Sequence, residues 1–345
     1  MKTKITNHVP TFLAAIMFLF LVHSPNAQAL TVSPVRIELS GDSGTTITKE
    51  ITLSNDSQAG EETYYISYSN FEAQGETGSP LFVEPKSDLG TWMTTPEQSV
   101  TLKANESKKV LLSINIPQDA YAGGHFAVVF FGNNPNNTDG GQVSVGAKTG
   151  TLILLSVNGD VLEAGGLASF NTIDKKFFFN TLPVGLEYRF KNDGNDRVKP
   201  DGKIKIRNTF YIPVETLDAN TVSGNVLPHS TRLFSTEWIK HKTSSIDDVH
   251  HSFIGSYFDK VSYQWKNFAL GLYIAKLDLV YGTAGIHNSK TALFFVFPWQ
   301  LMIIIILILL VIFFVGRKFI KGYNRRIIEK ARLSMQNTQN EADHV

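Results

Sequence analysis

The chain has 345 residues, with 32 lysines and arginines against 31 aspartates and glutamates, and it contains no cysteine. The absence of cysteine excludes intrachain disulfides, thiolate metal sites and cysteine nucleophiles. A net charge of +1 gives no indication of an acidic or nucleic-acid partner. Because 43 % of the residues are apolar, the chain can build ordinary hydrophobic cores without covalent crosslinks.

Residues 1–29 have the pattern of a cleavable signal peptide. A basic start, an apolar run, a helix breaker and a small-residue site follow in order: Lys2 and Lys4, Phe12 to Val22, Pro25, and Ala27-Gln28-Ala29. We expect cleavage after Ala29 and exclude these residues from the fold. The alternative is an uncleaved anchor, although the apolar run is shorter than the about 20 residues that a spanning helix needs.

The uncharged stretch 293–315 predicts a C-terminal transmembrane helix. Seven basic residues then fall within sixteen positions: Arg317, Lys318, Lys321, Arg325, Arg326, Lys330 and Arg332. Such a cluster favours the cytoplasmic side of a membrane, and this explains the charges better than nucleic-acid binding does. We therefore expect a single-pass protein of the cell membrane, with a cytoplasmic tail at residues 316–345 and an ectodomain outside the cytoplasm.

The region between the two membrane signals has the pattern of short β-strands. Val110, Leu112, Ile114 and Ile116 alternate with polar residues, and other segments repeat this period of two. Turn clusters rich in Gly, Asn and Asp separate the segments. The fold class predicted is all-β, with two tandem immunoglobulin-like antiparallel β-sandwiches at residues 30–165 and 166–292, plus the C-terminal transmembrane helix. No helical period is evident outside the membrane segment.

One strand of the second sandwich changes its phase. Leu272 and Ile274 alternate in one parity, whereas Leu277 and Leu279 take the other. A shift by one residue within a strand is what a β-bulge produces, so the sequence predicts a bulge here.

Residues 239–266 depart from the strand rhythm and are predicted to be an insertion on the second sandwich. Aromatic residues concentrate in and just before this segment, and they are our candidates for partner binding: Trp238, Tyr257, Phe258, Tyr263 and Trp265. Rings that are exposed together can stack on sugars or anchor a protein. The alternative is that the rings fill the core.

The sequence gives little sign of catalytic or metal chemistry. Asp247-Asp248-Val249-His250-His251 holds four residues of metal-ligating type, but sequence adjacency does not make ligands converge, so a solvated loop is expected and no metal site is predicted. His125 lies between a Gly-Gly pair and an apolar strand, and we expect it to be a hydrogen-bonded structural histidine. Nucleophile-elbow, phosphate-loop and zinc-protease motifs are missing from the sequence, so we expect neither an enzyme nor a cofactor.

Several segments carry a family likeness: residues 30–39, residues 70–73, the Trp92 segment, and residues 122–125 running into residues 128–131. They resemble bacterial surface proteins of the WxL-interacting type. The resemblance implies an N-terminal immunoglobulin-like domain that binds peptidoglycan, a second β-domain, a membrane helix and a short basic tail. The first domain also resembles, more distantly, the N-terminal domain of pilus chaperones.

Two hypotheses for function follow. The main one is a membrane-anchored cell-surface binding or scaffolding protein that attaches to cell-wall polysaccharide or to other surface proteins. The alternative is an envelope assembly factor, similar to a pilus chaperone, that binds strands of its partners at an exposed sheet edge. The anchor counts against the alternative, because pilus chaperones are usually soluble. Neither hypothesis involves nucleic acid.

Overall fold

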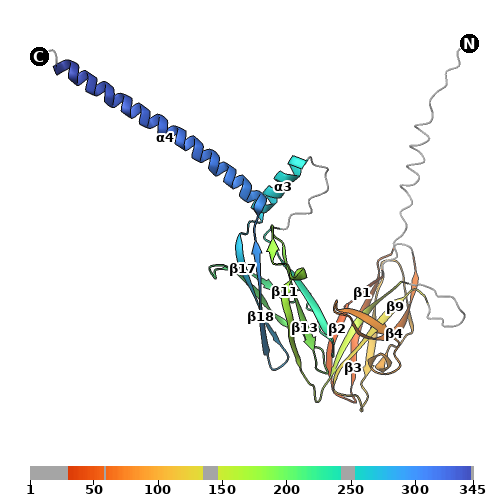
Figure 1. Ribbon diagram of the computed structural model, residues 1–345. Coiled ribbons are helices and arrows are strands. Elements are labelled where there is room, and N and C mark those ends of the chain that lie inside the picture. The colour runs from red at the N-terminus through yellow and green to blue at the C-terminus, as the bar shows by residue number, and fades with distance from the viewer. Residues whose placement is uncertain (1–29, 58–59, 135–146, 242–252, 343–345) are drawn as a thin grey trace, which may run out of the picture. The chain divides into compact units, whose positions relative to one another are not determined.

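The computed structural model describes residues 30–57, 60–134, 147–241 and 253–342. The predicted signal peptide and the Asp247-to-His251 run lie outside these residues. The described chain is mostly β-sheet and ends in a long helix (Figure 1). It forms two compact units: unit 1 takes residues up to 166 with 191–199 and 224–232, and unit 2 takes the rest.

Unit 1 contains two sheets. The first has the order β1-β3-β8-β6, with bounds Leu30–Ser33, Thr46–Asn55, Ser107–Asn115 and Met93–Thr94. The second has the order β2-β10-β9-β4-β5, with β7 also paired to β4, and its bounds are Arg36–Gly41, Lys148–Val157, Gly123–Gly132, Glu62–Gln74, Ser79–Val83 and Ser99–Leu102. A short helix α2, Leu89–Trp92, precedes β6.

The core of unit 1 comes from the predicted alternation. Leu112 and Ile114 of β8 are fully buried, and they belong to the same cluster as Phe131 and Ile153 of the other sheet. Because side chains of a strand point alternately to opposite faces, one residue in two reaches this shared core. The period of two in the sequence is therefore confirmed here as a β-sandwich pattern.

The first two strands of unit 1, β1 and β2, belong to different sheets. β1 pairs with β3 in antiparallel orientation, whereas β2, just beyond Pro34, pairs with β10 in parallel orientation. The chain keeps its direction as it passes from β1 to β2. As a result, β2 runs in the same direction as β10. A parallel pair of this kind departs from the purely antiparallel arrangement that we predicted.

Unit 2 is built mainly from a three-stranded and a five-stranded sheet. The first has the order β11-β13-β16, with bounds Gly165–Thr172, Val184–Asn192 and Thr231–Trp238. The second has the order β12-β18-β17-β14-β15, with bounds Phe178–Phe179, Ile286–Val296, Gly271–Tyr281, Asp201–Asn208 and Pro213–Asp218. A one-turn helix η1, Ile173–Lys175, lies between β11 and β12.

The predicted bulge in β17 is wrong. Its buried side chains alternate without interruption from Tyr273 to Tyr281, and its register with β18 is continuous. Leu272 and Ile274 are apolar residues on the other, half-buried face of the strand. Both faces of this strand carry apolar side chains near its start. The sequence pattern therefore resembles a shift by one residue although the strand has none.

Two helices correct other expectations. α3, Phe253–Lys266, occupies the segment where we expected no helix, and α4 runs over Trp299–Ala342. Residues 293–296 belong to β18, so the apolar stretch that we assigned to the membrane from residue 293 begins as a strand. From Trp299 to Arg332, α4 is long and apolar enough to cross a membrane.

We predict that Trp238→Ala destabilises unit 2 by about 3–5 kcal/mol, since it empties a fully buried ring site. The ring packs against Tyr273 and Phe294, with centroids 4.9 and 6.0 Å away. Trp265→Ala is the matched control, because that ring is exposed and its loss should cost about 0.5 kcal/mol or less. Urea unfolding of the detergent-solubilised protein, followed by circular dichroism, measures both. Equal effects of the two variants would contradict the assignment of Trp238 to the core.

Candidate functional site

The first candidate site of unit 1 is the edge of β10 before β2 begins. β2 pairs with residues Leu152 to Val157, whereas β10 starts at Lys148. The Leu152 N–H donates to the Val35 carbonyl at 3.0 Å, where this ladder begins. In the described part of the chain, no strand continues the ladder beside Thr149 and Gly150. At these two residues β10 is therefore paired with β9 on one side only, and its other side is an open edge.

Gly150 presents the hydrogen-bonding groups of this open edge. Neighbouring residues of a strand direct their N–H and C=O groups to opposite sides, so Gly150 directs its groups to the same side as Leu152. On its other side the chain lies very close to β9, because a Cβ at Gly150 would stand 2.4 Å from the Val129 carbonyl oxygen. Glycine is therefore required here by the close approach of the neighbouring strand.

A hollow of about 200 Å³ opens beside this edge, at one end of the sandwich. It lies between the sheets, since its lining joins Leu30 of β1 to Phe131 of β9 and Thr149 of β10. Tyr64 and Phe131 give it a buried aromatic floor. An apolar side chain of the right size could enter it from an added strand, because side chains of such a strand would point alternately toward and away from the core.

Tyr64 stays a neutral donor at the floor of the hollow. Burial, followed by the neighbouring Glu62 charge, raises the pKa of Tyr64 to about 12. Its hydroxyl donates to Glu62 Oε2 at 3.3 Å. The protonated phenol at neutral pH therefore adds a polar contact to the hollow without adding charge.

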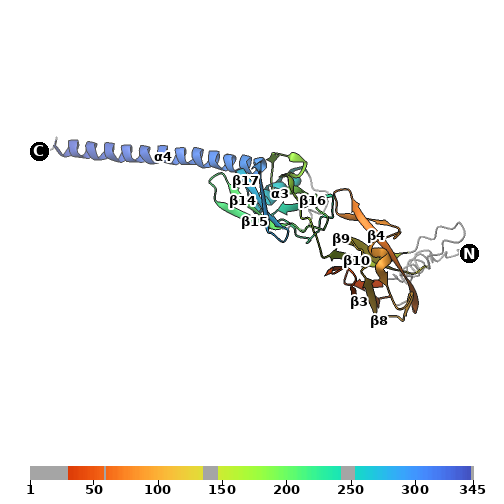
Figure 2. The same ribbon diagram turned by 90° about the horizontal axis from the view of Figure 1, so that it is seen from below.

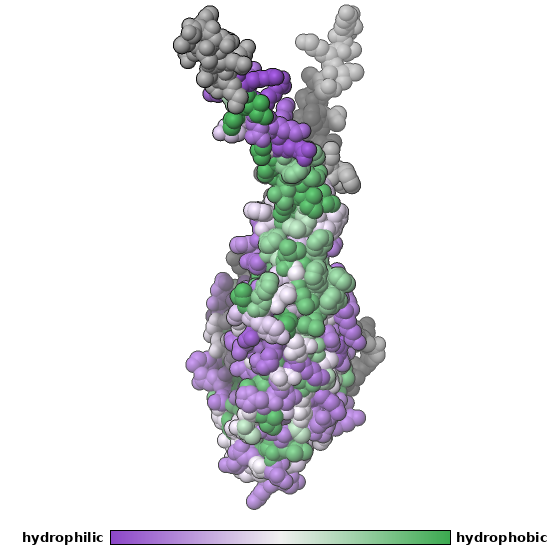
Figure 3. Space-filling view, turned by 60° about the vertical axis from the view of Figure 1, so that its left-hand side comes forward, coloured by the Kyte–Doolittle hydropathy of each residue, from purple (hydrophilic) through white to green (hydrophobic). Residues whose placement is uncertain are grey.

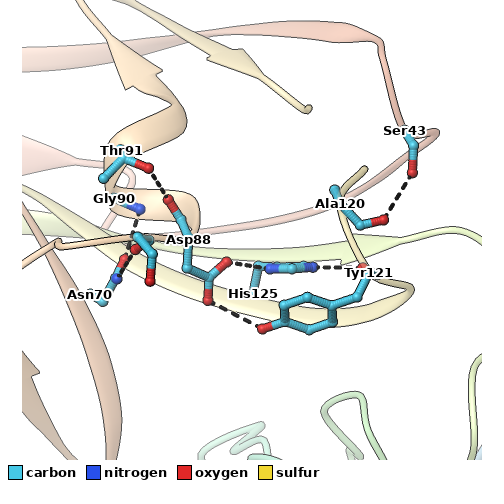
Figure 4. A network of polar contacts seen from close by, with 9 residues as sticks. Ser43, Asn70, Asp88, Gly90, Thr91, Ala120, Tyr121 and His125 are labelled. Atoms are coloured by element: carbon cyan, nitrogen blue, oxygen red, sulfur yellow. Dashed lines mark hydrogen bonds and ion pairs between the residues drawn. The ribbon is translucent and has the colours of Figure 1, made fainter. Parts of the chain in front are cut away.

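A second cluster surrounds His125, which is fully buried in β9 (Figure 4). Its Nδ1 meets Asp88 Oδ1 in a short contact, and its Nε2 lies 2.9 Å from the Tyr121 carbonyl oxygen. The Tyr121 hydroxyl donates to the second Asp88 oxygen at 3.3 Å. Burial, then the Asp88 charge, raises the pKa of Tyr121 to about 12, so its hydroxyl is a donor at neutral pH.

This cluster joins two loops and one strand, and it gives no free base. Both nitrogens of the His125 ring face oxygen atoms of the protein, so neither nitrogen is open to a substrate. Trp92 and Tyr121 pack on the ring, with centroids 4.6 and 4.2 Å away. The expectation of a hydrogen-bonded structural histidine is confirmed.

The five aromatic candidates do not form one surface. Trp238 lies fully in the core of unit 2, so its predicted role in partner binding is wrong; it is the last residue of β16, and its side chain is buried. Tyr257 and Tyr263 are half-buried on α3, whereas Phe258 and Trp265 are exposed on the same helix. The basic residues expected to set the membrane topology are all exposed on α4: Arg317, Lys318, Lys321, Arg325 and Arg326.

Sequence reasoning missed the open edge of β10. The sequence signal was a glycine, Gly150, at the start of an apolar strand, and a glycine inside a strand often marks a close backbone approach. Only the pairing of β2 shows which part of the strand is left open. Within the described ranges, no group of three or more His, Cys, Asp or Glu side chains gathers as a metal site would require.

Several of the solved structures that are similar to this chain are fimbrial chaperones. The class 5 fimbriae chaperone CfaA is 13 % identical over 77 % of this chain and 99 % of its own, with a TM-score of 0.36. The Escherichia coli chaperone DraB is 9 % identical over 77 % of this chain and 97 % of its own, with a TM-score of 0.34. A Salmonella enterica SafA pilin in complex with the SafB chaperone matches at 10 % identity, 79 % and 98 % coverage and a TM-score of 0.32.

No family model matches the chain, and a comparison with curated proteins finds no significant match. The likeness to WxL-interacting surface proteins therefore stays a prediction. At these identities and TM-scores the solved structures transfer no residue and no activity to this chain.

The comparisons nevertheless correct our main functional hypothesis. We expected a surface protein that attaches to wall polymer or to other surface proteins, whereas the matching structures are pilus and fimbrial chaperones. The main hypothesis is therefore wrong, and the alternative of an envelope assembly factor remains as a proposal. Cell-wall polysaccharide as a partner has no support.

We predict that Asp88→Ala destabilises unit 1 by about 1–3 kcal/mol, because it leaves the buried His125 without its acceptor. The backbone at Asp88 has φ 73° and ψ −165°, a region that favours glycine. Asp88→Gly removes the same carboxylate but relieves this strain, so it should cost about 1 kcal/mol less than the alanine variant. Urea unfolding followed by the fluorescence of Trp92, which packs on His125, measures the difference. Identical stabilities of the two variants would show that the backbone at this position is not strained.

Proposed function

We propose that this protein is a membrane-held envelope assembly factor that binds an extended segment of a partner protein. The partner segment adds to β10 beside Thr149 and Gly150, where it continues the line of β2. The observation that carries the proposal is the open edge at Gly150 next to a hollow between the sheets.

The geometry fits the addition of a strand. A partner backbone beside β10 would satisfy the N–H and C=O of Gly150, and main-chain hydrogen bonds of this kind supply affinity without sequence specificity. Specificity would come from the hollow, where Leu30, Tyr64 and Phe131 offer apolar contact to one side chain of the partner. Glu62 and Lys148 at its border add polar contacts, so a partner with an apolar residue flanked by polar ones is favoured.

The orientation in the membrane is part of the same proposal. α4 would cross the bilayer once, with its basic residues in the cytoplasm and units 1 and 2 on the outer side. An assembly factor that is held at the membrane can meet its partners as they emerge from it, which gives the anchor a role that a soluble chaperone lacks.

A photoreactive amino acid at Thr149 should crosslink a partner protein in the native cell, because this side chain lines the hollow. The control position is Leu111, which is exposed on β8 of the other sheet. Mass spectrometry should place the crosslinks in one extended segment of the partner, and hydrogen exchange should show that the Gly150 amide becomes protected when this segment binds. Equal crosslinking from both positions, or an unchanged exchange rate at Gly150, would contradict the proposed site.

The proposed topology is tested with single cysteines, since the native chain has none. A membrane-impermeant maleimide applied to cells with any outer barrier permeabilised should label Val222→Cys, which is an exposed position of unit 2. Lys318→Cys, beyond the apolar part of α4, should react only after lysis. Labelling of Lys318→Cys before lysis would show that the orientation is the reverse of the one proposed.

A further inference from the structure

Unit 2 continues into α4 with almost no linker. β18 ends at Val296 and α4 begins at Trp299, so two residues intervene. These can span about 7 Å even when fully extended. Phe297 is also held by the sheet, because its N–H donates to the Phe179 carbonyl at 2.8 Å. If α4 crosses a membrane, this end of the sheet must lie at the membrane surface.

Hydrogen bonds to the first turn of α4 hold α3 at this end of the sheet. The Tyr257 hydroxyl donates to the Gln300 carbonyl at 3.1 Å, and Gln264 Oε1 accepts from the Leu301 N–H at 2.9 Å. The Gln264 and Gln300 side chains also contact each other directly. Gln264 thus satisfies an N–H that a helix start leaves without an internal partner. Figures 1 and 2 both show α3 beside the start of α4.

The face of α3 next to this attachment is apolar and exposed. Tyr257 and Gln264, seven residues apart, face α4, and Phe258 and Trp265 repeat this spacing one position further on. Residues seven apart lie on the same side of a helix. The exposed rings of Phe258 and Trp265 therefore form a stripe next to the side of α3 that faces α4. Phe258 is 56 % exposed and Trp265 is 67 % exposed.

Strand register brings further exposed apolar residues to this end of the sheet. Gly271 of β17 lies opposite Val296, Asn208 of β14 lies opposite Tyr273, and Phe178 of β12 lies opposite Phe295. The loop that follows β14 therefore extends from the same end. Together with the stripe of α3 these residues form a rim of exposed apolar side chains: Phe178, Phe210, Tyr211, Ile212, Phe258 and Trp265.

The opposite end of the same sheet differs. The turn between β17 and β18 there is Gly282-Thr283-Ala284-Gly285, which carries no large apolar side chain. Val222, in the segment after β15, is exposed at that end. Exposed aromatic residues thus gather at the end where the chain enters α4, and Figure 3 shows an apolar surface that begins there and follows the helix.

Lysines accompany the aromatic rim. Lys260 and Lys266 are exposed on α3, the Lys240 ammonium donates to the Phe268 carbonyl at 2.5 Å, and Lys176 lies over the Phe179 ring at 5.1 Å. Aromatic rings and lysines together are typical of the zone where lipid headgroups meet the hydrocarbon.

We propose that this rim is a lipid-binding surface that docks unit 2 onto the bilayer which α4 crosses. The rim enters the headgroup zone, Phe210 and Trp265 contact the upper acyl chains, and the lysines contact lipid phosphates. A bilayer fits better than a protein partner because the short junction already forces the rim to the depth of this zone, which is several Å thick on each side. The inference goes beyond strand binding and concerns a different unit.

The test uses the full chain in nanodiscs of phosphatidylcholine and phosphatidylglycerol. An environment-sensitive fluorophore is attached to single cysteines: Phe210→Cys and Trp265→Cys on the rim, Val222→Cys at the other end of the sheet, and Leu307→Cys within α4. The rim labels should show blue-shifted emission and several-fold stronger quenching by headgroup spin-labelled lipid than the label at Val222. The label at Leu307 should be quenched by lipid that is spin-labelled deep in the acyl chain.

Two results would overturn the inference. Quenching at the rim equal to that at Val222, with deep quenching at Leu307, would show that α4 spans the bilayer while unit 2 stands away from it. A Leu307 label that no lipid quenches would show that α4 does not enter the bilayer, and the rim would then lose its proposed partner. The first result would overturn this inference alone, whereas the second would also overturn the proposed membrane crossing of α4; neither result bears on strand binding at β10 in unit 1.

Discussion

The parallel pairing of β2 with β10 is the interaction that determines where the sheet of unit 1 has an open edge. The chain begins in one sheet as β1, crosses at Pro34 and joins the other sheet as β2, so a single strand holds the edges of both. Because it reaches β10 only from Leu152 onward, it also decides where that edge stays open. The same crossover that closes the sandwich thus leaves the short open edge at Gly150, beside the hollow between the sheets.

Exposed strand edges are normally a liability, since they offer unpaired backbone groups to any other strand. This chain keeps its open edge short and places it at one end of the sandwich. A hollow with an aromatic floor lies beside it, which adds side-chain selection to backbone pairing. That combination is what the proposed binding of an extended segment requires.

The long helix α4 is joined directly to the sheets of unit 2. Gln264 contributes both to α3 and to the first turn of α4, so the helix that leaves the sheet is held by side chains and not by a free hinge. An anchor joined so directly to a rigid sheet would fix the orientation of unit 2 relative to the bilayer. A flexible tether would keep the protein near the membrane but would not fix the orientation of unit 2.

The sequence by itself determined the features that follow from local periodicity. The alternation at Leu112 and Ile114 predicted the sandwich core, and the apolar stretch at residues 293–315 predicted a C-terminal helix that is long and apolar enough to cross a membrane, although its first residues belong to β18. The tertiary structure alone decided the rest. The sequence could not show that Trp238 is buried while Trp265 is exposed, because burial depends on which strand or helix covers a ring and not on the ring itself. It could not show the open edge at Gly150 either, since an edge is defined by the end of a partner strand more than a hundred residues away in the chain.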